Sequence, residues 1–262
     1  MKSGPIEIFK QEVVDNISSL GKANDLQRLS LDWFVESFKY KYSYNFSALG
    51  RPIIQYPQDI IAMQEIIWKV KPDLIIETGI AHGGSLIMSA SVLSLIDYCE
   101  AVEKGEKLDP KAPNRRRVLG IDIDIRAHNH EAILAHPMAH RIEMIQGSSI
   151  DPDTVTKVKQ FAKGYKNILV TLDSNHSHKH VLAELEAYAP LVTPGSYCVV
   201  MDTIVDLMPD GTVIDRPWGK HDNPRTAALE YAKKHKEFMV DKDIDHKLQI
   251  TGCPDGFLKR VH

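Results

Sequence analysis

The chain has 262 residues, of which 43% are hydrophobic and 26% are charged, and its formal net charge is −3. This charge gives no reason to expect a nucleic acid or an anionic membrane as a partner, and no apolar run approaches the ~20 residues that a membrane span needs. We expect a cytoplasmic protein, because the first residues lack the apolar core of a signal peptide and the three cysteines are too widely spaced for a disulfide framework or a zinc site.

The first 50 residues predict a helical, amphipathic extension that precedes a larger domain over residues 51–262. Between Phe38 and Phe46, aromatic residues alternate with polar ones. This alternation favours a strand or an extended arm that packs on a neighbouring element. The alternative is a lid or an arm that joins copies of the chain, in which case we expect a homo-oligomer.

From residue 59 onward, predicted helices and strands alternate, which indicates an α/β fold with a mostly parallel, twisted sheet and helices on both faces. We expect helices over 59–70, 86–95, 128–135, 153–163, 178–188 and 225–236, and strands over 74–76, 118–124, 141–145, 167–172 and 197–201. Residues 248–251 and 256–260 suggest a terminal antiparallel pair of strands. The charged segment 100–117, which contains Arg115, Arg116 and Arg117, is expected to be a solvated loop.

A strand, a glycine-rich turn and a helix follow one another in the segment 73–95. Glu77 ends the strand, and Gly79, Gly83 and Gly84 lead into the helix. Glycine lets a backbone turn sharply and approach a ligand closely. The pattern Glu-x-Gly-x-x-x-Gly-Gly-Ser matches neither the dinucleotide fingerprint nor the phosphate loop, and its acid would repel a pyrophosphate but suits a cationic ligand. The spacing resembles the first motif of methyltransferases that use S-adenosylmethionine (SAM); the alternative is a simple tight turn.

Acidic residues follow most of the predicted strands at their carboxyl ends, where an open parallel sheet binds its ligands. They are Glu77, Asp122 with Asp124, Asp173 and Asp202, while the third strand leads into Gly147, Ser148 and Ser149. Buried carboxylates need partners, which here would be a cationic cofactor, ribose hydroxyls or a metal ion. Asp122 is placed to accept both ribose hydroxyls of a nucleoside, unless it only caps the following turn. The 147–149 segment would let the backbone approach an adenine.

Asp173 and Asp202 give the strongest indication of metal binding and catalysis. Two carboxylates on adjacent strand ends suit a hard cation such as Mg²⁺, which prefers oxygen ligands. His176, three residues after Asp173, could act as a general base near neutral pH. His178 is the alternative base, and further imidazole ligands could instead select Zn²⁺ or iron.

Several motifs together resemble the cephalosporin hydroxylase family, and the similarity covers roughly residues 50–260. They are the segments 77–85, 120–125, 141–149, 172–176 and 188–192, with Arg216-Pro-Trp218 and Asn223-Pro224. Despite the family's name, this resemblance implies a Rossmann-like class I methyltransferase fold. It also implies kinship with metal-dependent O-methyltransferases that act on sugars.

The resemblance implies a role for individual residues. SAM would lie near Glu77, Gly79, His82, Gly83, Ser85, Asp122 and Ser148, and Mg²⁺ would bind Asp173 and Asp202. The related macrolide-sugar methyltransferases hold their metal with an Asp and a Glu-Asp pair, and they take their base from an Asp-x-x-His spacing. Asp173 and His176 match that spacing, whereas Met201 stands where the Glu would be. Water or another acid such as Asp206 would then complete the metal site, or the metal would be weak or absent.

We therefore expect a SAM-dependent, Mg²⁺-assisted O-methyltransferase that acts on a hydroxyl of a sugar, a nucleotide-sugar or another sugar-containing metabolite. Two alternatives remain open. The acid and histidine cluster could hold iron in a metal-dependent hydroxylase, although such sites are commonly built on a β-barrel. Alternatively, the chain could bind SAM without catalysing a reaction, which the residue Met201 makes worth considering.

Overall fold

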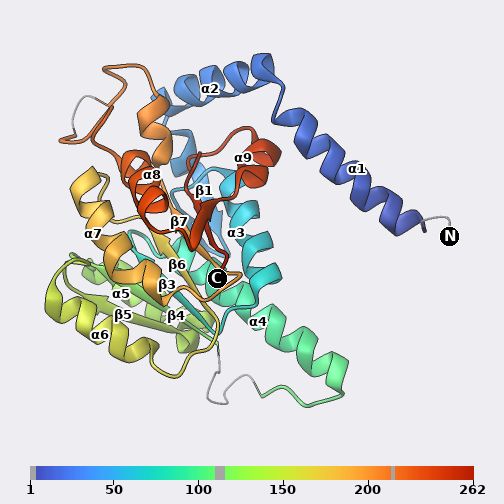
Figure 1. Ribbon diagram of the computed structural model, residues 1–262. Coiled ribbons are helices and arrows are strands. Elements are labelled where there is room, and N and C mark those ends of the chain that lie inside the picture. The colour runs from blue at the N-terminus through green and yellow to red at the C-terminus, as the bar shows by residue number, and fades with distance from the viewer. Residues whose placement is uncertain (1–3, 110–115, 214–215) are drawn as a thin grey trace.

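A seven-stranded sheet forms the centre of the molecule in the computed structural model, which describes residues 4–109, 116–213 and 216–262 (Figure 1). The strand order is β5-β4-β3-β6-β7-β9-β8; the first five are parallel, and β9 runs antiparallel to both of its neighbours. The strands are β3 Leu74–Thr78, β4 Arg117–Asp122, β5 Ile142–Gln146, β6 Ile168–Leu172, β7 Tyr197–Val200, β8 Phe238–Val240 and β9 Phe257–Arg260. The predicted α/β fold with a mostly parallel sheet is confirmed.

Helices cover both faces of this sheet, because alternate strand residues are apolar on each side. On β3, Ile75 packs in the cluster that α3 and α4 cover, and Leu74 and Ile76 pack in the cluster that α6, α7 and α8 cover. The α-helices of this domain are α3 Pro57–Val70, α4 Gly84–Lys104, α5 Ala127–Leu134, α6 Pro152–Ala162, α7 His178–Tyr188, α8 Pro224–Lys234 and α9 Lys242–Leu248. Short 3-10 helices are η2 Pro137–Arg141, η3 Ala189–Leu191 and η4 Thr203–Leu207.

Helix α4 is nine residues longer at its C-terminal end than the predicted span 86–95. It is long and apolar enough to cross a membrane by length and composition. However, Leu86, Ile87, Leu93 and Ile96 are buried in the core of the domain. The apolar run of α4 therefore has a packing role in this fold.

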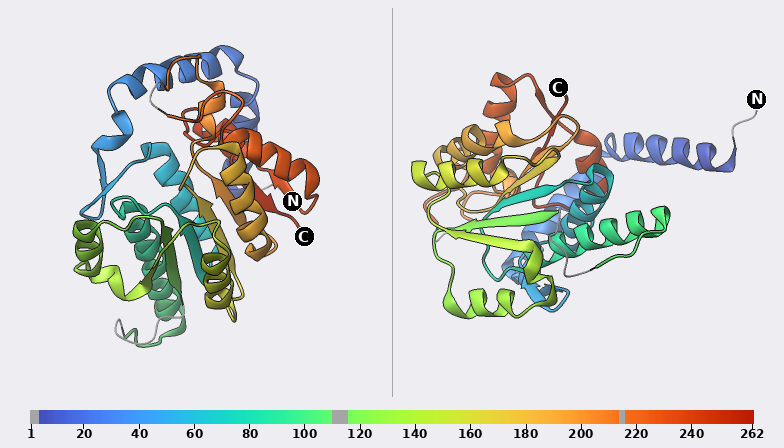
Figure 2. Two further views of the ribbon diagram at one scale, coloured as in Figure 1. Left: turned by 90° about the vertical axis from the view of Figure 1, so that its left-hand side faces the viewer. Right: turned by 90° about the horizontal axis from the view of Figure 1, so that it is seen from below.

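Two helices, α1 Pro5–Leu20 and α2 Asn24–Lys39, precede the sheet. Helix α1 extends away from the body and has no buried residue (Figures 1 and 2). Helix α2 packs on the body through Phe34, whose ring stacks on Tyr56 at a centroid distance of 4.2 Å. A hairpin of β1 Phe46–Ala48 and β2 Arg51–Ile53 then crosses the expected domain boundary at residue 50.

The strand or arm predicted over residues 38–46 is wrong, because most of this segment is helical. Helix α2 ends at Lys39, and η1 Tyr42–Asn45 follows before β1 begins. The aromatic rings gather on one another instead of alternating across a sheet: the Trp33 and Tyr42 centroids lie 5.1 Å apart, and those of Tyr42 and Phe46 lie 5.0 Å apart. Packing of rings therefore outweighs the alternating pattern.

The predicted terminal strand pair has one wrong partner. Strand β9 pairs with β7 and β8, whereas residues 248–251 contain the end of α9 and the loop after it. The polar groups of this loop do not pair with a neighbouring strand. Instead, the Thr251 hydroxyl and the Gly252 N–H both donate hydrogen bonds to the Asp59 side chain.

The charged segment 100–117 is only in part the expected solvated loop. Arg116 is buried, and it pairs with Asp97 and Glu100 of α4. Arg117 begins β4 and pairs with Glu143 at 3.2 Å. Arg115 lies outside the described residues.

Candidate active site

The glycine-rich turn after β3 packs directly against the backbone of neighbouring segments. Gly79 has φ +89°, and a Cβ on it would lie 2.1 Å from the carbonyl oxygen of Asp173 at the end of β6. A Cβ on Gly84, the first residue of α4, would lie 2.3 Å from the carbonyl oxygen of Pro52 on β2. Any side chain at either position would push these segments apart. The glycines are therefore required by the packing around the turn.

Glu77 lies beneath this turn and does not line the cavity above it. Its side chain is 3% exposed, and the Ser85 hydroxyl donates a hydrogen bond to it. Burial raises the pKa of Glu77 to about 8, although the hydrogen bond from Ser85 opposes this change. A cation above the turn would favour the ionised carboxylate.

Asp122, at the end of β4, is bonded to the backbone of the turn. Its Oδ2 accepts hydrogen bonds from the N–H of Ile80 at 2.7 Å and of Ala81 at 3.3 Å, and its Oδ1 accepts one from the N–H of Asp124 at 3.0 Å. Asp122 thus holds the turn in place, which is the alternative to the predicted ribose contact, and its predicted role toward a ribose stays a prediction.

A cavity of about 150 Å³ lies over the turn. Its wall includes five of the seven residues predicted to bind SAM, namely Gly79, His82, Gly83, Ser85 and Asp122. Asp173 also lines it. The sixth residue, Ser148, lies in an adjoining space of about 100 Å³ that Asp122 also lines, together with Ser149 and His180.

Three polar residues around this cavity were not predicted from the sequence. Arg51 donates to the carbonyl oxygen of His82 at 2.7 Å and to the Asn129 side chain at 3.1 Å. Asn129 in turn donates to the carbonyl oxygen of Ala81 at 3.0 Å, so the two residues hold the turn from outside. Gln55 is 8% exposed and lines the cavity, and its Oε1 has no hydrogen-bond partner among the described residues.

The second part of the site is a cluster of Asp173, His176 and Asp202, each able to offer one ligand atom, all within 4.8 Å of one another. His176 Nε2 lies 3.0 Å from Asp202 Oδ2 and 3.5 Å from Asp173 Oδ1. Trp218 packs edge-on against the His176 ring, with the centroids 4.8 Å apart. Two carboxylates and an imidazole form a donor set that fits a divalent cation.

The charges in this cluster depend on one another. Burial would lower the pKa of His176, but the carboxylates of Asp202 and Asp173 raise it to about 10. Burial raises the pKa of Asp173 to about 6. Asp202 has a lowered pKa, because the His176 imidazolium outweighs the effect of desolvation. The two acids therefore favour the protonated form of the His176 imidazole when no other cation lies beside them.

The other candidates near the cluster are engaged elsewhere. His178 begins α7 and faces α8, where its Nδ1 lies 2.8 Å from the Thr226 hydroxyl and its Nε2 lies 3.2 Å from Glu230. His180 contacts the Ser149 hydroxyl at 3.0 Å. Asp206, suggested as a substitute metal ligand, is paired with Arg225 at 2.7 Å and is not part of the cluster.

A buried carboxyl, Asp59 on α3, lies behind Asp202. A Cβ on Gly252 would lie 3.3 Å from Asp59 Oδ2 and 3.7 Å from Asp202 Oδ1, so a bare glycine separates the two acids. The Gly252 N–H donates to Asp59 at 2.8 Å. Burial raises the pKa of Asp59 to about 7, against the effect of its hydrogen bonds with Thr251 and Gly252.

Asp59 is expected to make stability depend on pH. Its carboxyl has a pKa of about 7 in the folded chain and an ordinary value of 3.8, so the unfolded chain releases this proton first as the pH rises. The free energy of unfolding should therefore fall between about pH 4 and 7, by an amount on the order of 4 kcal/mol. Asp59→Asn should flatten this decline in chemical denaturation at a series of pH values. Parallel pH profiles for the two proteins would contradict the assignment.

Comparisons with known proteins agree on one family. The family model described as Rhamnosyl O-methyltransferase/CmcI matches residues 40–261. The chain is 29% identical over 207 residues to a rhamnosyl O-methyltransferase of Mycobacterium tuberculosis H37Rv, which covers 77% of this chain and 73% of the relative. It is 28% identical over 230 residues to a rhamnosyl O-methyltransferase of Mycobacterium leprae, with 87% of each chain covered.

A solved structure has the same fold. A CmcI structure with Mg and SAM gives a TM-score of 0.55 at 18% identity, with 84% of this chain and 78% of the other covered. At this identity the likeness concerns the fold alone. It agrees with the Rossmann-like architecture of the central sheet.

Proposed function

The chain belongs to the Rhamnosyl O-methyltransferase/CmcI family, and we propose that it transfers the methyl group of SAM to a hydroxyl of a sugar or sugar-containing metabolite, assisted by Mg²⁺. The family confirms both the resemblance to cephalosporin hydroxylases and the predicted enzyme class, a SAM-dependent O-methyltransferase. One observation carries the proposal for this site. Asp173 lines the cavity over the glycine turn and also belongs to the Asp173, His176 and Asp202 cluster, so a methyl donor and an acceptor bound there would meet.

The cavity over the turn suits the cationic end of SAM. Glu77 and Asp173 place carboxyl groups under and beside it, and the unpartnered Oε1 of Gln55 can accept a hydrogen bond from an ammonium group. Ser148 and Ser149 line the adjoining space beyond Asp122, where an adenine would lie. The carboxylate of Asp173, which lines the cavity over the turn, would repel a pyrophosphate.

The cluster would hold the metal through Asp173 and Asp202. A divalent cation there supplies positive charge that lowers the pKa of a neighbouring hydroxyl. His176 can accept a proton at Nε2 only when the two acids have another cation beside them, because their charges otherwise hold it protonated. The acceptor O–H bond then breaks as His176 takes the proton. The oxygen forms its bond to the methyl carbon as the S–CH₃ bond breaks, and S-adenosylhomocysteine leaves.

The geometry of the cluster supports the hydroxylase alternative less well than the methyltransferase function. Among the described residues, one histidine joins two carboxylates in the cluster, whereas the common iron site has two histidines and one carboxylate. His178 and His180 bind other partners and do not supply the second imidazole.

We also propose an acceptor sugar and a surface for self-association. The mycobacterial relatives are named for rhamnosyl methylation, so we take a deoxyhexose unit as the first acceptor to test. Trp218 beside His176 offers an aromatic wall for such a ring. Self-association would use α1, whose Ile6, Phe9 and Val14 are more than half exposed.

Asp122→Ala is expected to weaken the binding of S-adenosylhomocysteine by roughly ten- to a hundredfold, because hydrogen bonds to a charged acceptor are worth about 1.5–3 kcal/mol. The variant loses the ribose contacts and also the bonds that hold the N–H groups of Ile80 and Ala81. Titration calorimetry measures the effect. Asp124→Ala is the matched control, since this exposed acid lies two residues away and does not hold the turn. An unchanged affinity in Asp122→Ala would remove Asp122 from the cofactor site.

A further inference from the structure

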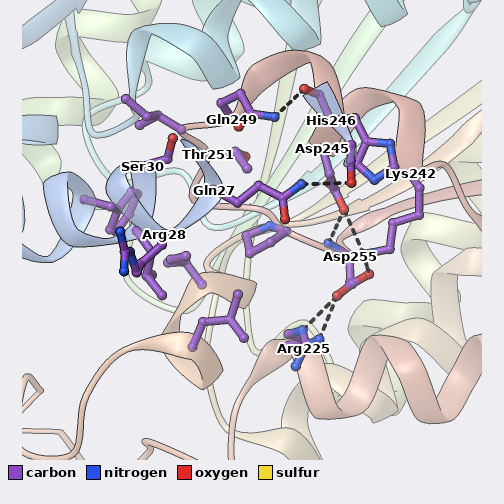
Figure 3. A pocket seen from close by; sticks show the side chains of 17 residues that line it. Gln27, Arg28, Ser30, Arg225, Lys242, Asp245, His246, Gln249, Thr251 and Asp255 are labelled. Atoms are coloured by element: carbon purple, nitrogen blue, oxygen red, sulfur yellow. Dashed lines mark hydrogen bonds and ion pairs between the residues drawn. The ribbon is translucent and has the colours of Figure 1, made fainter. Parts of the chain in front are cut away.

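A second, larger cavity of about 460 Å³ lies between α2, η4 and α9 (Figure 3). Asp173, His176 and Asp202 do not line it. Ile204 and Leu207 of η4 form part of its wall, and Thr251, which bonds to Asp59, forms another part. The cavity is thus a neighbour of the catalytic cluster with its own set of residues. Its volume falls in the range of small-molecule sites.

One side of this cavity is apolar. Leu31 and Phe34 come from α2, Ile204 from η4, and Ile250 and Pro254 from the loop after α9. Buried Phe34 is also stacked on Tyr56, so this wall is held in place by the aromatic packing of the body. Such a surface accepts the apolar face of a ring.

Ion pairs link Arg225, Lys242, Asp245 and Asp255 on the other side of the cavity (Figure 3). Arg225 lies 2.7 Å from Asp206 and 2.8 Å from Asp255. Lys242 pairs with Asp255 and lies 3.2 Å from Asp245. Arg28, the third cation of the wall, lies 3.5 Å from Asp25. Each of the three cations therefore already has a carboxylate partner, with which a phosphate or carboxylate ligand would have to compete.

Two acceptor atoms on the cavity residues lack partners. Asp245 Oδ1 and Gln249 Oε1 are both buried, and neither has a hydrogen-bond partner among the described residues. The Asp245 side chain is 11% exposed. Buried acceptors without a donor are costly, so a ligand that brings hydroxyl donors would be favoured at this position.

We propose that this cavity binds an uncharged, hydroxyl-rich ring, namely a saccharide unit. A saccharide has an apolar ring face for Phe34 and Ile204, and it has hydroxyls that can donate to Asp245 and Gln249. The unit is either a second sugar of the acceptor, which rests on the proposed function, or a free saccharide. Both share the same chemistry, and the experiment separates them.

The test is an NMR titration of the full chain with the methyl glycosides of rhamnose, fucose and glucose, each compared with its sugar 1-phosphate. At least one glycoside should shift the side-chain amide signals of Gln27 and Gln249, and its phosphate should bind more weakly. Leu31→Trp fills the cavity and should weaken that binding at least tenfold. Leu26→Trp, on an exposed position of the same helix that does not line the cavity, should leave it unchanged.

The affinity of Leu31→Trp for S-adenosylhomocysteine should stay near that of the native chain. This measurement shows that the variant is folded, and it tests cofactor binding, which belongs to the proposed function, separately from saccharide binding. A raised KM for a two-sugar acceptor alone would assign the cavity to the acceptor. Unchanged KM values in Leu31→Trp, together with amide shifts in the native chain that this variant loses, would assign the cavity to a free saccharide. No shift with any glycoside, tighter binding of the phosphates, or full binding by Leu31→Trp would overturn the proposal.

Discussion

His176→Ala is expected to lower kcat by about 10²–10⁴-fold, the usual contribution of a general base, with the affinity for S-adenosylhomocysteine near that of the native chain. His176 Nε2 lies between Asp202 and Asp173, and no hydrogen bond of this side chain to the glycine turn is observed among the described residues. Its loss should therefore affect proton removal from the acceptor and leave cofactor binding intact. Steady-state kinetics and calorimetry on the same preparation measure both quantities.

His178→Ala is the control for this prediction. Its side chain bonds to Thr226 and Glu230 of α8, on the side away from the acids, so its effect on kcat should be small. If His178→Ala were the inactive enzyme and His176→Ala the active one, the assignment of the base would be wrong. The methyltransferase function would survive that result.

Asp173→Asn and Asp202→Asn should each abolish activity that depends on added metal. The native enzyme should lose activity in a chelator and regain it with Mg²⁺, whereas neither variant should be rescued. Each substitution removes a charged ligand from a cluster that has only two carboxylates among the described residues. The loss of metal affinity should exceed the roughly 10–100-fold cost of losing a supporting contact.

Binding of Mn²⁺ to the full chain, followed by calorimetry, measures this affinity independently of catalysis. Asp124→Asn is a suitable control, because this exposed acid belongs to the same sheet edge but not to the cluster. Full activity of the native enzyme in chelator would show that the two acids act through hydrogen bonds alone.

Local patterns predicted the parts of this fold that local physics determines. Strands β3 and β6 are apolar runs buried on both faces, and the helices that alternate with the parallel strands have apolar faces of helical spacing. Segments whose structure depends on distant partners were predicted less well. Residues 248–251 have the composition of a strand, but Thr251 and Gly252 bond to Asp59, which is more than 190 residues away in the sequence.

In the candidate site, too, the features that local sequence determines were predicted, and those that depend on distant contacts were not. Strand ends and glycines predicted the cavity over the turn, because the ends of parallel strands meet at one edge. Arg51, Asn129 and Asp59 were missed, since each acts on residues 31 to 193 positions away and carries no motif of its own. The choice between His176 and His178 also needed the fold, which turns one toward the acids and the other toward α8.

The most direct test of the proposed function is to incubate the enzyme with Mg²⁺, a rhamnoside acceptor and SAM that carries an isotopic label in its methyl group. The acceptor should exchange one hydroxyl hydrogen for the labelled methyl group, so the product should be heavier by CH₂ plus the label and should form in step with S-adenosylhomocysteine. An acceptor that instead gained one oxygen atom, in a reaction that needs iron and O₂ and leaves SAM unchanged, would contradict the proposed function.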